Sequence, residues 1–134
     1  MKNVNNLMSQ INLKEKQLEK INFKRIDKEP EKEEIEVDAD TSYEIIELTN
    51  DTLKIKTETV VRIIPEAFFT ANISYIIEYE LFRKITENEV KNNINKFIRI
   101  IGSDLSVVLS ILTEKTLGFH FVLPPNIFFS DTTD

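Results

Sequence analysis

Hydrophobic residues recur with helical spacing in the last third of the chain, within residues 102–129. The i, i+3, i+4, i+7 positions of one helical face are occupied by Leu105, Val108, Leu109 and Leu112. Val107 and Ile111 add a second apolar face, which indicates burial on more than one side, under a sheet or against another subunit. The pattern predicts a helix over residues 103–116.

Capping residues mark the ends of this helix. Ser103 is a candidate N-cap, and Gly118 follows the last periodic residue, as is typical of a helix C-terminus. The double proline at residues 124–125 excludes any regular continuation. A preceding helix is predicted to begin at the T-x-x-E capping box of residues 86–89. The apolar stripe of this preceding helix continues in phase into residues 103–116. The sequence therefore fits either two helices joined at residues 102–104 or one bent helix.

Upstream of the helices, four segments alternate apolar and polar residues with the period of a β-strand: residues 17–26, 41–48, 52–64 and 68–82. The second and third are joined by Thr49-Asn50-Asp51, which predicts a hairpin. Short links favour an antiparallel meander. We therefore predict an α+β fold, with a four-stranded antiparallel meander sheet packed by one or two C-terminal helices. Residues 1–16 fit helix and strand periods equally well and stay unassigned.

A change of composition separates the first two predicted strands. Residues 27–40 carry eight acidic side chains against two lysines, with Pro30 among them. Such a run repels itself and buries little, so it predicts a mobile acidic loop that ends in a strand near Ile35 and Val37. The alternative is that the run forms an acidic docking strip for a basic partner.

Length, charge and composition exclude several classes of protein. We expect a single domain over residues 1–134. The net charge of −6 and the scattered lysines argue against nucleic-acid binding. The absence of cysteine excludes disulfides and thiolate metal sites. The polar start MKNVNNLMSQ does not resemble a signal peptide, and no apolar run reaches the roughly 18 residues of a membrane span. These observations favour a cytoplasmic protein.

The sequence shows no motif for catalysis or for a cofactor. The only histidine, His120, lies between Phe119 and Phe121, and its sequence neighbours provide no metal ligand or catalytic partner. The H-E-x-x-H and G-x-S-x-G patterns are absent, and two glycines in the whole chain leave little scope for a phosphate-binding loop. We expect no catalytic residue, no metal, no cofactor and no enzyme activity.

Aromatic residues gather in the predicted longest strand and in the C-terminal segment. Most of them are expected to pack in the core, but an exposed subset would form a groove for apolar polypeptide, because aromatic rings offer large and adaptable contact areas. We predict that this groove is lined by Phe68, Tyr75, Tyr79, Phe119, Phe121 and Phe128.

The order of these features resembles the SecB family of export chaperones. In that family an apolar helix is followed by a glycine with an aromatic residue, and then by a leucine-proline-proline-like segment. Here residues 105–116, Gly118-Phe119 and Leu123-Pro124-Pro125-Asn126-Ile127-Phe128 correspond. Ile21-Asn22-Phe23 is similar to the family's first-strand motif. The resemblance spans most of the chain, and its motifs agree mainly over residues 20–24 and 102–129.

The resemblance implies a cytoplasmic, ATP-independent holdase that binds unfolded polypeptide. It also implies a homo-oligomer, a dimer or a tetramer, built through edge strands and helices. Members that deliver preproteins to SecA carry acidic residues around the first-strand motif, where this chain has Lys20 and Lys24. The family's metal-binding C-terminal tail has no counterpart after residue 129. The resemblance also implies a role in protein export, and both departures count against SecA as the partner in that role.

Two other classes of function compete with the holdase. One is a dedicated interaction module of the same fold that binds a single partner, such as an antitoxin or a mobile-element protein. The other is a small enzyme or a ligand pocket between helix and sheet, which ranks last because no catalytic motif supports it.

Overall fold

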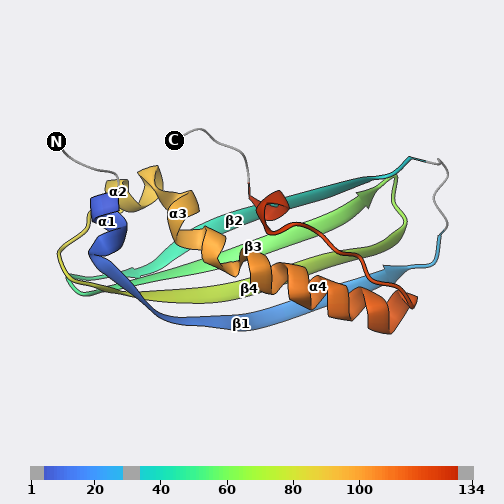
Figure 1. Ribbon diagram of the computed structural model, residues 1–134, viewed down its shortest axis with the longest axis horizontal. Helices are drawn as coiled ribbons and strands as arrows, with labels where there is room; N and C mark the ends of the chain where they lie inside the picture. Colours follow the sequence, from blue (N-terminus) through green and yellow to red (C-terminus); the bar gives the residue numbers. More distant parts are fainter. Residues whose placement is uncertain (1–4, 29–33, 130–134) are drawn as a thin grey trace.

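A four-stranded antiparallel sheet forms the framework of the protein (Figure 1). The computed structural model describes residues 5–28 and 34–129. The strands are β1 (Ile11–Ile26), β2 (Glu36–Leu48), β3 (Thr52–Ile64) and β4 (Phe68–Leu81). Together with the helices that follow, they confirm the predicted α+β class and its four-stranded antiparallel sheet.

The order of the strands across the sheet is β1-β4-β3-β2. β2, β3 and β4 form a meander, as expected, but β1 pairs with β4 and not with β2. The register places Ile11 opposite Leu81 and Ile26 opposite Phe68. The meander therefore comprises three strands joined by links of three residues each, and β1 adds to it along the free edge of β4.

Two predicted boundaries differ from the structure. β1 begins at Ile11, upstream of the expected residue 17, and follows the short helix α1 (Asn5–Ser9). β2 begins at Glu36, so residues 36–40 of the predicted acidic loop lie in a strand paired with β3. Val37 belongs to β2, as anticipated, and residues 29–33 of the predicted loop lie outside the described residues.

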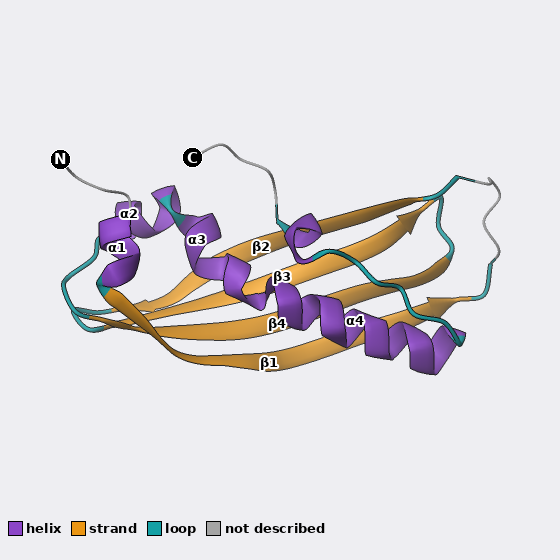
Figure 2. Ribbon diagram, in the orientation of Figure 1, coloured by secondary structure: helices purple, strands orange, loops and turns teal. Residues whose placement is uncertain are grey.

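The helices lie on one side of the sheet (Figure 2). They are α2 (Glu87–Asn92), α3 (Ile94–Ile98), the 3₁₀ turn η1 (Arg99–Ile101), α4 (Gly102–Leu117) and the 3₁₀ turn η2 (Pro125–Phe128). The capping box of Thr86 and Glu89 and the left-handed Gly118, with φ of 85°, are confirmed. Ser103 is not the N-cap, because α4 continues directly from η1 and already includes Gly102.

The core lies between this helical layer and one face of the sheet. Odd-numbered residues of β3 and β4 point into it, including Ile55, Ile73 and Ile77, and they meet Leu105 and Leu109 of α4. The opposite face of the sheet is polar. It carries cross-strand ion pairs: Lys56 with Glu19, Lys54 with Glu47, and Arg62 with Asp38. One face of the sheet is thus buried and the other is solvated.

Candidate functional site

Five phenylalanines meet at one end of the sheet and form what we call the phenylalanine cluster: Phe23, Phe68, Phe69, Phe119 and Phe121. Phe69 contacts Phe23 with a ring-centroid distance of 5.1 Å and Phe121 with 5.4 Å. Phe68 lies 5.9 Å from Phe119 and 5.8 Å from Phe121. These distances are those of favourable aromatic pairs, so residues from β1, β4 and the segment after α4 share one apolar site.

The phenylalanine cluster runs from the core to the surface. Phe69 is 1% exposed, Phe23, Phe68 and Phe121 are half-buried, and Phe119 is 45% exposed. The buried ring of Phe69 packs against Phe23 and Phe121 and restricts their motion. These rings would therefore lose little further conformational freedom when a ligand binds. The cluster therefore presents an outward aromatic edge on a rigid base.

The start of β4 turns Phe68 toward the cluster. Phe68 has φ of 63°, in the left-handed region that residues other than glycine rarely adopt. The Phe69 N–H donates to the Ala67 carbonyl at 2.7 Å, which marks a tight turn at this point. The turn brings the rings of two consecutive residues, Phe68 and Phe69, against the same partner, Phe121.

Side chains of α4 hold the segment that carries the other two rings. The Phe121 N–H donates to Thr113 Oγ1 at 2.9 Å, and this hydroxyl donates to the Leu109 carbonyl at 2.8 Å. Ser110 Oγ and His120 Nδ1 lie 2.9 Å apart, and Ser106 Oγ donates to the Leu123 carbonyl. The polar stripe of α4 thus anchors residues 119–123 through three separate side chains. The contact of His120 with Ser110 thus helps to hold this segment against α4.

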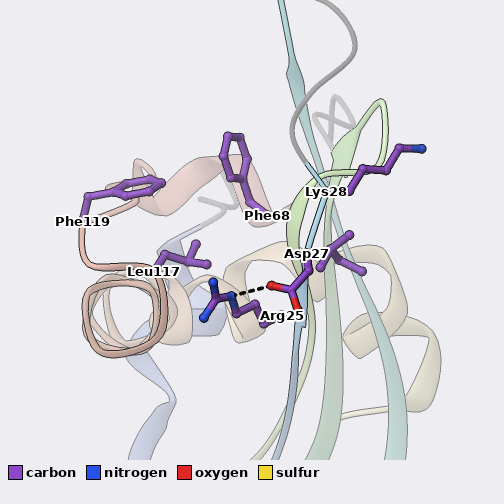
Figure 3. Close-up of a pocket in the computed structure, with 7 residues that line it drawn as sticks. Arg25, Asp27, Lys28, Phe68, Leu117 and Phe119 are labelled. Atoms are coloured by element: carbon purple, nitrogen blue, oxygen red, sulfur yellow. Dashed lines mark ion pairs between the residues drawn. The ribbon is translucent and has the colours of Figure 1, made fainter.

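A pocket of about 340 Å³ opens beside the exposed rings (Figure 3). Its apolar wall consists of Phe68, Phe119, Leu117 and Ile26. Its polar side contains Arg25, Asp27 and Lys28, with Arg25 Nε 3.0 Å from an Asp27 carboxylate oxygen. Figure 3 shows Lys28 directed away from the two rings. The pocket can accept an apolar side chain whose neighbouring main chain faces the polar side.

Three of the predicted groove residues lie in the core. Tyr75 and Tyr79 are buried under the helical layer, and the Tyr79 hydroxyl donates to the Phe97 carbonyl. Burial raises the pKa of Tyr79 to about 12, and burial, with a smaller contribution from Asp104, raises the pKa of Tyr75. Phe128 is also buried, and its carbonyl accepts a hydrogen bond from Thr41 Oγ1 at 2.7 Å. Only Phe68, Phe119 and Phe121 of the predicted set come together at a surface.

The sequence interpretation missed the residues that complete the site. Phe23 was assigned to a strand, but the pairing of β1 with β4 was needed to place it against Phe69. Leu117 and Ile26 were not singled out, because they become neighbours only when the end of α4 reaches the end of β1. The alternation of Ile21 and Phe23 with polar residues was the one available signal that Phe23 faces the helices.

A second exposed apolar surface runs along α4 and β1. Val107 and Ile111 of α4 are 57% and 51% exposed, and Leu18 and Ile21 of β1 are also exposed. Lys16 Nζ lies 3.2 Å from an Asp104 carboxylate oxygen, which fixes the start of α4 beside β1. The end of α4 reaches the end of β1 at the pocket described above, so the helix follows the strand along this length (Figure 1).

Comparison with solved structures identifies the fold. The Mycobacterium tuberculosis Rv1957 SecB-like chaperone, solved in complex with a ChAD peptide from the Rv1956 HigA1 antitoxin, superposes with a TM-score of 0.73. The sequence identity is 11%, and the match covers 88% of this chain and 92% of the chaperone chain. The protein therefore has a SecB-like fold.

Other comparisons add little. A protein of unknown function from Streptococcus agalactiae gives a TM-score of 0.48 at 11% identity, with 84% of this chain and 95% of that chain covered. No protein-family model and no curated protein sequence matches the chain. In the described part of the chain, no helix has the length and apolar character needed to cross a membrane.

Proposed function

We propose that this protein is a cytoplasmic SecB-like holdase that binds unfolded or partly folded polypeptide at the phenylalanine cluster without ATP. The observation that carries the proposal is the outer edge of that cluster, where Phe68 and Phe119 border an open apolar pocket. The SecB-like fold supports it, because the similar M. tuberculosis protein is described as a chaperone in complex with a peptide.

The physical reasoning starts from what an unfolded chain offers. Such a chain exposes apolar side chains in many sequences, so a receptor for it needs large contact area and tolerance of shape. Phenylalanine rings supply both, and the rigid inner rings keep the cost of ordering low. Burying one client side chain in the pocket would contribute about 2 kcal/mol, so several contacts along a client are required for tight binding.

A dedicated single-partner module is the second candidate. One observation favours it: the M. tuberculosis protein of the same fold is described with a peptide from one particular antitoxin. The same pocket would serve such a partner, but the binding would be saturable by one protein and would not suppress aggregation in general. SecA is the weaker proposal as a partner, since Lys20 and Lys24 are exposed on β1, where preprotein-delivering members are acidic.

We also propose that the apolar surface of α4 and β1 is covered by a second copy of the chain. Val107, Ile111, Leu18 and Ile21 form a stripe of exposed hydrophobic residues that water would otherwise contact. Val107→Asp combined with Ile111→Asp should convert the oligomer to a monomer in sedimentation equilibrium. A wild-type protein that sediments as a monomer would contradict this part of the proposal.

Light scattering of a chemically unfolded protein, diluted into buffer with and without this chain, tests the main proposal. The wild type should suppress aggregation near equal molar amounts without ATP, and Phe119→Ala should weaken capture about tenfold, since it removes one large apolar contact. Phe82→Ala is a matched control: Phe82 is 64% exposed and lies beyond the other end of β4, about 45 Å from Phe68 by strand rise.

The outcomes separate the two candidates. Suppression that Phe119→Ala reduces and Phe82→Ala leaves unchanged supports the holdase. Absence of suppression, together with saturable capture of one protein that Phe119→Ala weakens, favours the single-partner module. Equal effects of the two substitutions would reject the phenylalanine cluster as the client site.

A further inference from the structure

Two lysines of β1 on the solvated face of the sheet have no ion-pair partner. Lys20 lies opposite Ser74 of β4 and Lys24 opposite Thr70, so both lysine side chains point away from the helical layer. Both lysines are exposed, and among the described residues neither belongs to an ion pair. They lie about 13 Å apart by strand rise. The β1 side of this face therefore carries positive charge that its own sheet does not neutralise.

Most other charges on this face are paired or lie farther from β1. Four cations each lie within 3.8 Å of a carboxylate oxygen: Lys14 of Glu78, Lys54 of Glu47, Lys56 of Glu19 and Arg62 of Asp38. Glu58 of β3 accepts a hydrogen bond from Asn72 Nδ2 at 2.7 Å and is two strand spacings, about 10 Å, from β1. Asp40 and Glu44 of β2 are about 14 Å from β1. Both distances exceed the screening length of roughly 8 Å at physiological salt, so these acids do not cancel the charge of the two lysines.

A mostly apolar pocket of about 380 Å³ lies beside Lys24, at the turn between β3 and β4. It is lined by Arg62, Ile63, Ile64, Glu66, Phe69 and Thr70. The register of β3 with β4 ends at Arg62 and Thr70, and the pocket occupies the turn beyond this pair. Thr70 is also the register partner of Lys24, so Lys24 lies one strand spacing, about 5 Å, from the pocket lining. Ile64 is 46% exposed at this pocket, which leaves apolar surface next to the positive charge.

β1 separates this surface from the phenylalanine cluster. Successive residues of a strand point to opposite faces of the sheet. Phe23 packs on Phe69 within the cluster, whereas Lys24, the next residue, points to the solvated face. A ligand of the cluster and a ligand of the two lysines therefore approach the protein from opposite sides of the sheet.

The chemistry of this surface selects its ligand. Two separated ammonium groups attract carboxylates at a matching separation, and the neighbouring pocket accepts one apolar side chain. A nucleic acid fits less well, because its phosphates are spaced much more closely than the two lysines and the net charge of the protein is −6. The combination of spaced charges and an apolar anchor site is suited to a segment of protein that carries acidic residues and one exposed apolar residue.

We propose that this surface docks an acidic segment of a partner polypeptide. Lys20 and Lys24 pair with two of its carboxylates, and the pocket at the turn between β3 and β4 takes its apolar side chain. The docking does not depend on the phenylalanine cluster. If the cluster holds a client, the partner and the client are bound at the same time, one on each side of β1.

Fluorescence anisotropy with a labelled twelve-residue peptide tests the charge requirement. The peptide contains one leucine followed by glutamates that alternate with serines. It should bind the wild type with an affinity that falls as the salt concentration rises, because exposed charges are screened. A second peptide with glutamine in place of every glutamate should bind about tenfold more weakly. Equal binding of the two peptides would overturn the proposal.

Two double variants locate the charges. Lys20→Gln with Lys24→Gln should weaken binding of the acidic peptide about tenfold, because two exposed ion pairs are lost. Lys84→Gln with Lys115→Gln removes the same net charge from exposed positions beyond the far end of β4 and on α4. This control should change the affinity by less than about twofold. Equal effects of the two double variants would reduce the interaction to diffuse charge attraction and contradict a defined site.

A double-mutant cycle tests the pocket. Ile64→Ala should weaken binding of the acidic peptide about fivefold, because it removes part of the apolar lining. The same substitution should not change the affinity for a peptide in which the leucine is replaced by serine. Ile64 is half exposed, so the variant should keep the circular dichroism spectrum of the wild type. Additive effects of the two changes would show that the leucine does not enter this pocket, and the proposal would be wrong.

Three further measurements exclude other ligands and sites. Phe119→Ala should leave the affinity for the acidic peptide unchanged, so failure of the client site is distinguishable from failure here; a loss of affinity would place the peptide at the phenylalanine cluster and overturn the proposal. A change of oligomeric state in the variant that lacks Lys20 and Lys24, measured by sedimentation, would assign the face to a second copy. Polyuridylate that binds as tightly as the acidic peptide would indicate a general anion surface. Either result would contradict the proposal.

Discussion

Replacing Thr113 by valine removes the hydroxyl that joins α4 to the segment of Phe119 and Phe121. Thr113 is fully buried, and its Oγ1 accepts from the Phe121 N–H at 2.9 Å. Valine has the same shape and leaves this N–H without its partner. Loss of an acceptor at a partly buried donor costs about 1–2 kcal/mol, and the added methyl group returns about 0.5 kcal/mol. The free energy of unfolding should therefore fall by about 1 kcal/mol.

Urea denaturation and amide hydrogen exchange check this value. For a chain of 134 residues a loss of 1 kcal/mol corresponds to a fall in melting temperature of about 4 °C. The Phe121 amide should exchange faster in the variant, and client capture should weaken, because two rings of the phenylalanine cluster lose their anchor. The amides in the centre of β3 should keep their protection relative to global unfolding.

Thr116→Val provides the control for this substitution. Thr116 is exposed, and its Oγ1 donates to the Leu112 carbonyl within the same helix. Its replacement should change stability by less than about 0.5 kcal/mol. Equal stability changes in the two variants, or an unchanged exchange rate at Phe121, would refute the role of Thr113 as the anchor.

Three other predictions test the framework. Leu109→Asp, at a fully buried site, should cost about 4 kcal/mol or more and unfold the chain by circular dichroism, whereas Val107→Asp on the exposed face of α4 should leave it folded. Gly102→Ala should lower the free energy of unfolding, measured by urea denaturation, by about 1–3 kcal/mol, because a Cβ at this position would lie 2.7 Å from the Pro125 carbonyl oxygen. A urea midpoint equal to that of the wild type would contradict this close packing. The hydrogen bond from Arg83 lowers the pKa of Glu89 to about 2 from an ordinary 4.5, so the stabilisation by ionised Glu89 is present above about pH 4.5 and is lost as the pH falls toward 2. Glu89→Gln should reduce the pH dependence of the urea midpoint between these two values. A pH profile identical to that of the wild type would show that Glu89 does not contribute.

The sequence predicted the positions of helices and strands more accurately than it predicted which strands pair with each other. Alternation marks a strand and its buried face, but it carries no information on which strand lies beside it, so the pairing of β1 with β4 was missed. The acidic run was predicted to be a loop that ends in a strand near Ile35 and Val37, because its charge was considered and the alternation that continues to Thr41 was not. Val37, Ala39 and Thr41 face the helices, while the acids between them face water, which is a strand pattern.

The candidate site was predicted in part for a similar reason. Phe68, Phe119 and Phe121 were predicted because aromatic residues gather in the longest predicted strand and in the C-terminal segment. Tyr75 and Tyr79 share the odd positions of Ile73 and Ile77, which mark the buried face of β4, and that parity would have assigned them to the core. Phe23 could not be placed without the register of β1 against β4.

The division of the phenylalanine cluster between distant parts of the chain has a consequence during protein synthesis. Phe23, Phe68 and Phe69 leave the ribosome with the sheet, whereas Phe119 and Phe121 follow only after α4. A nascent chain that stops at Gly118 thus contains every strand but lacks two of the rings and half of the pocket's aromatic wall. Under the proposed function, capture of a client would therefore begin only after translation has passed Phe121.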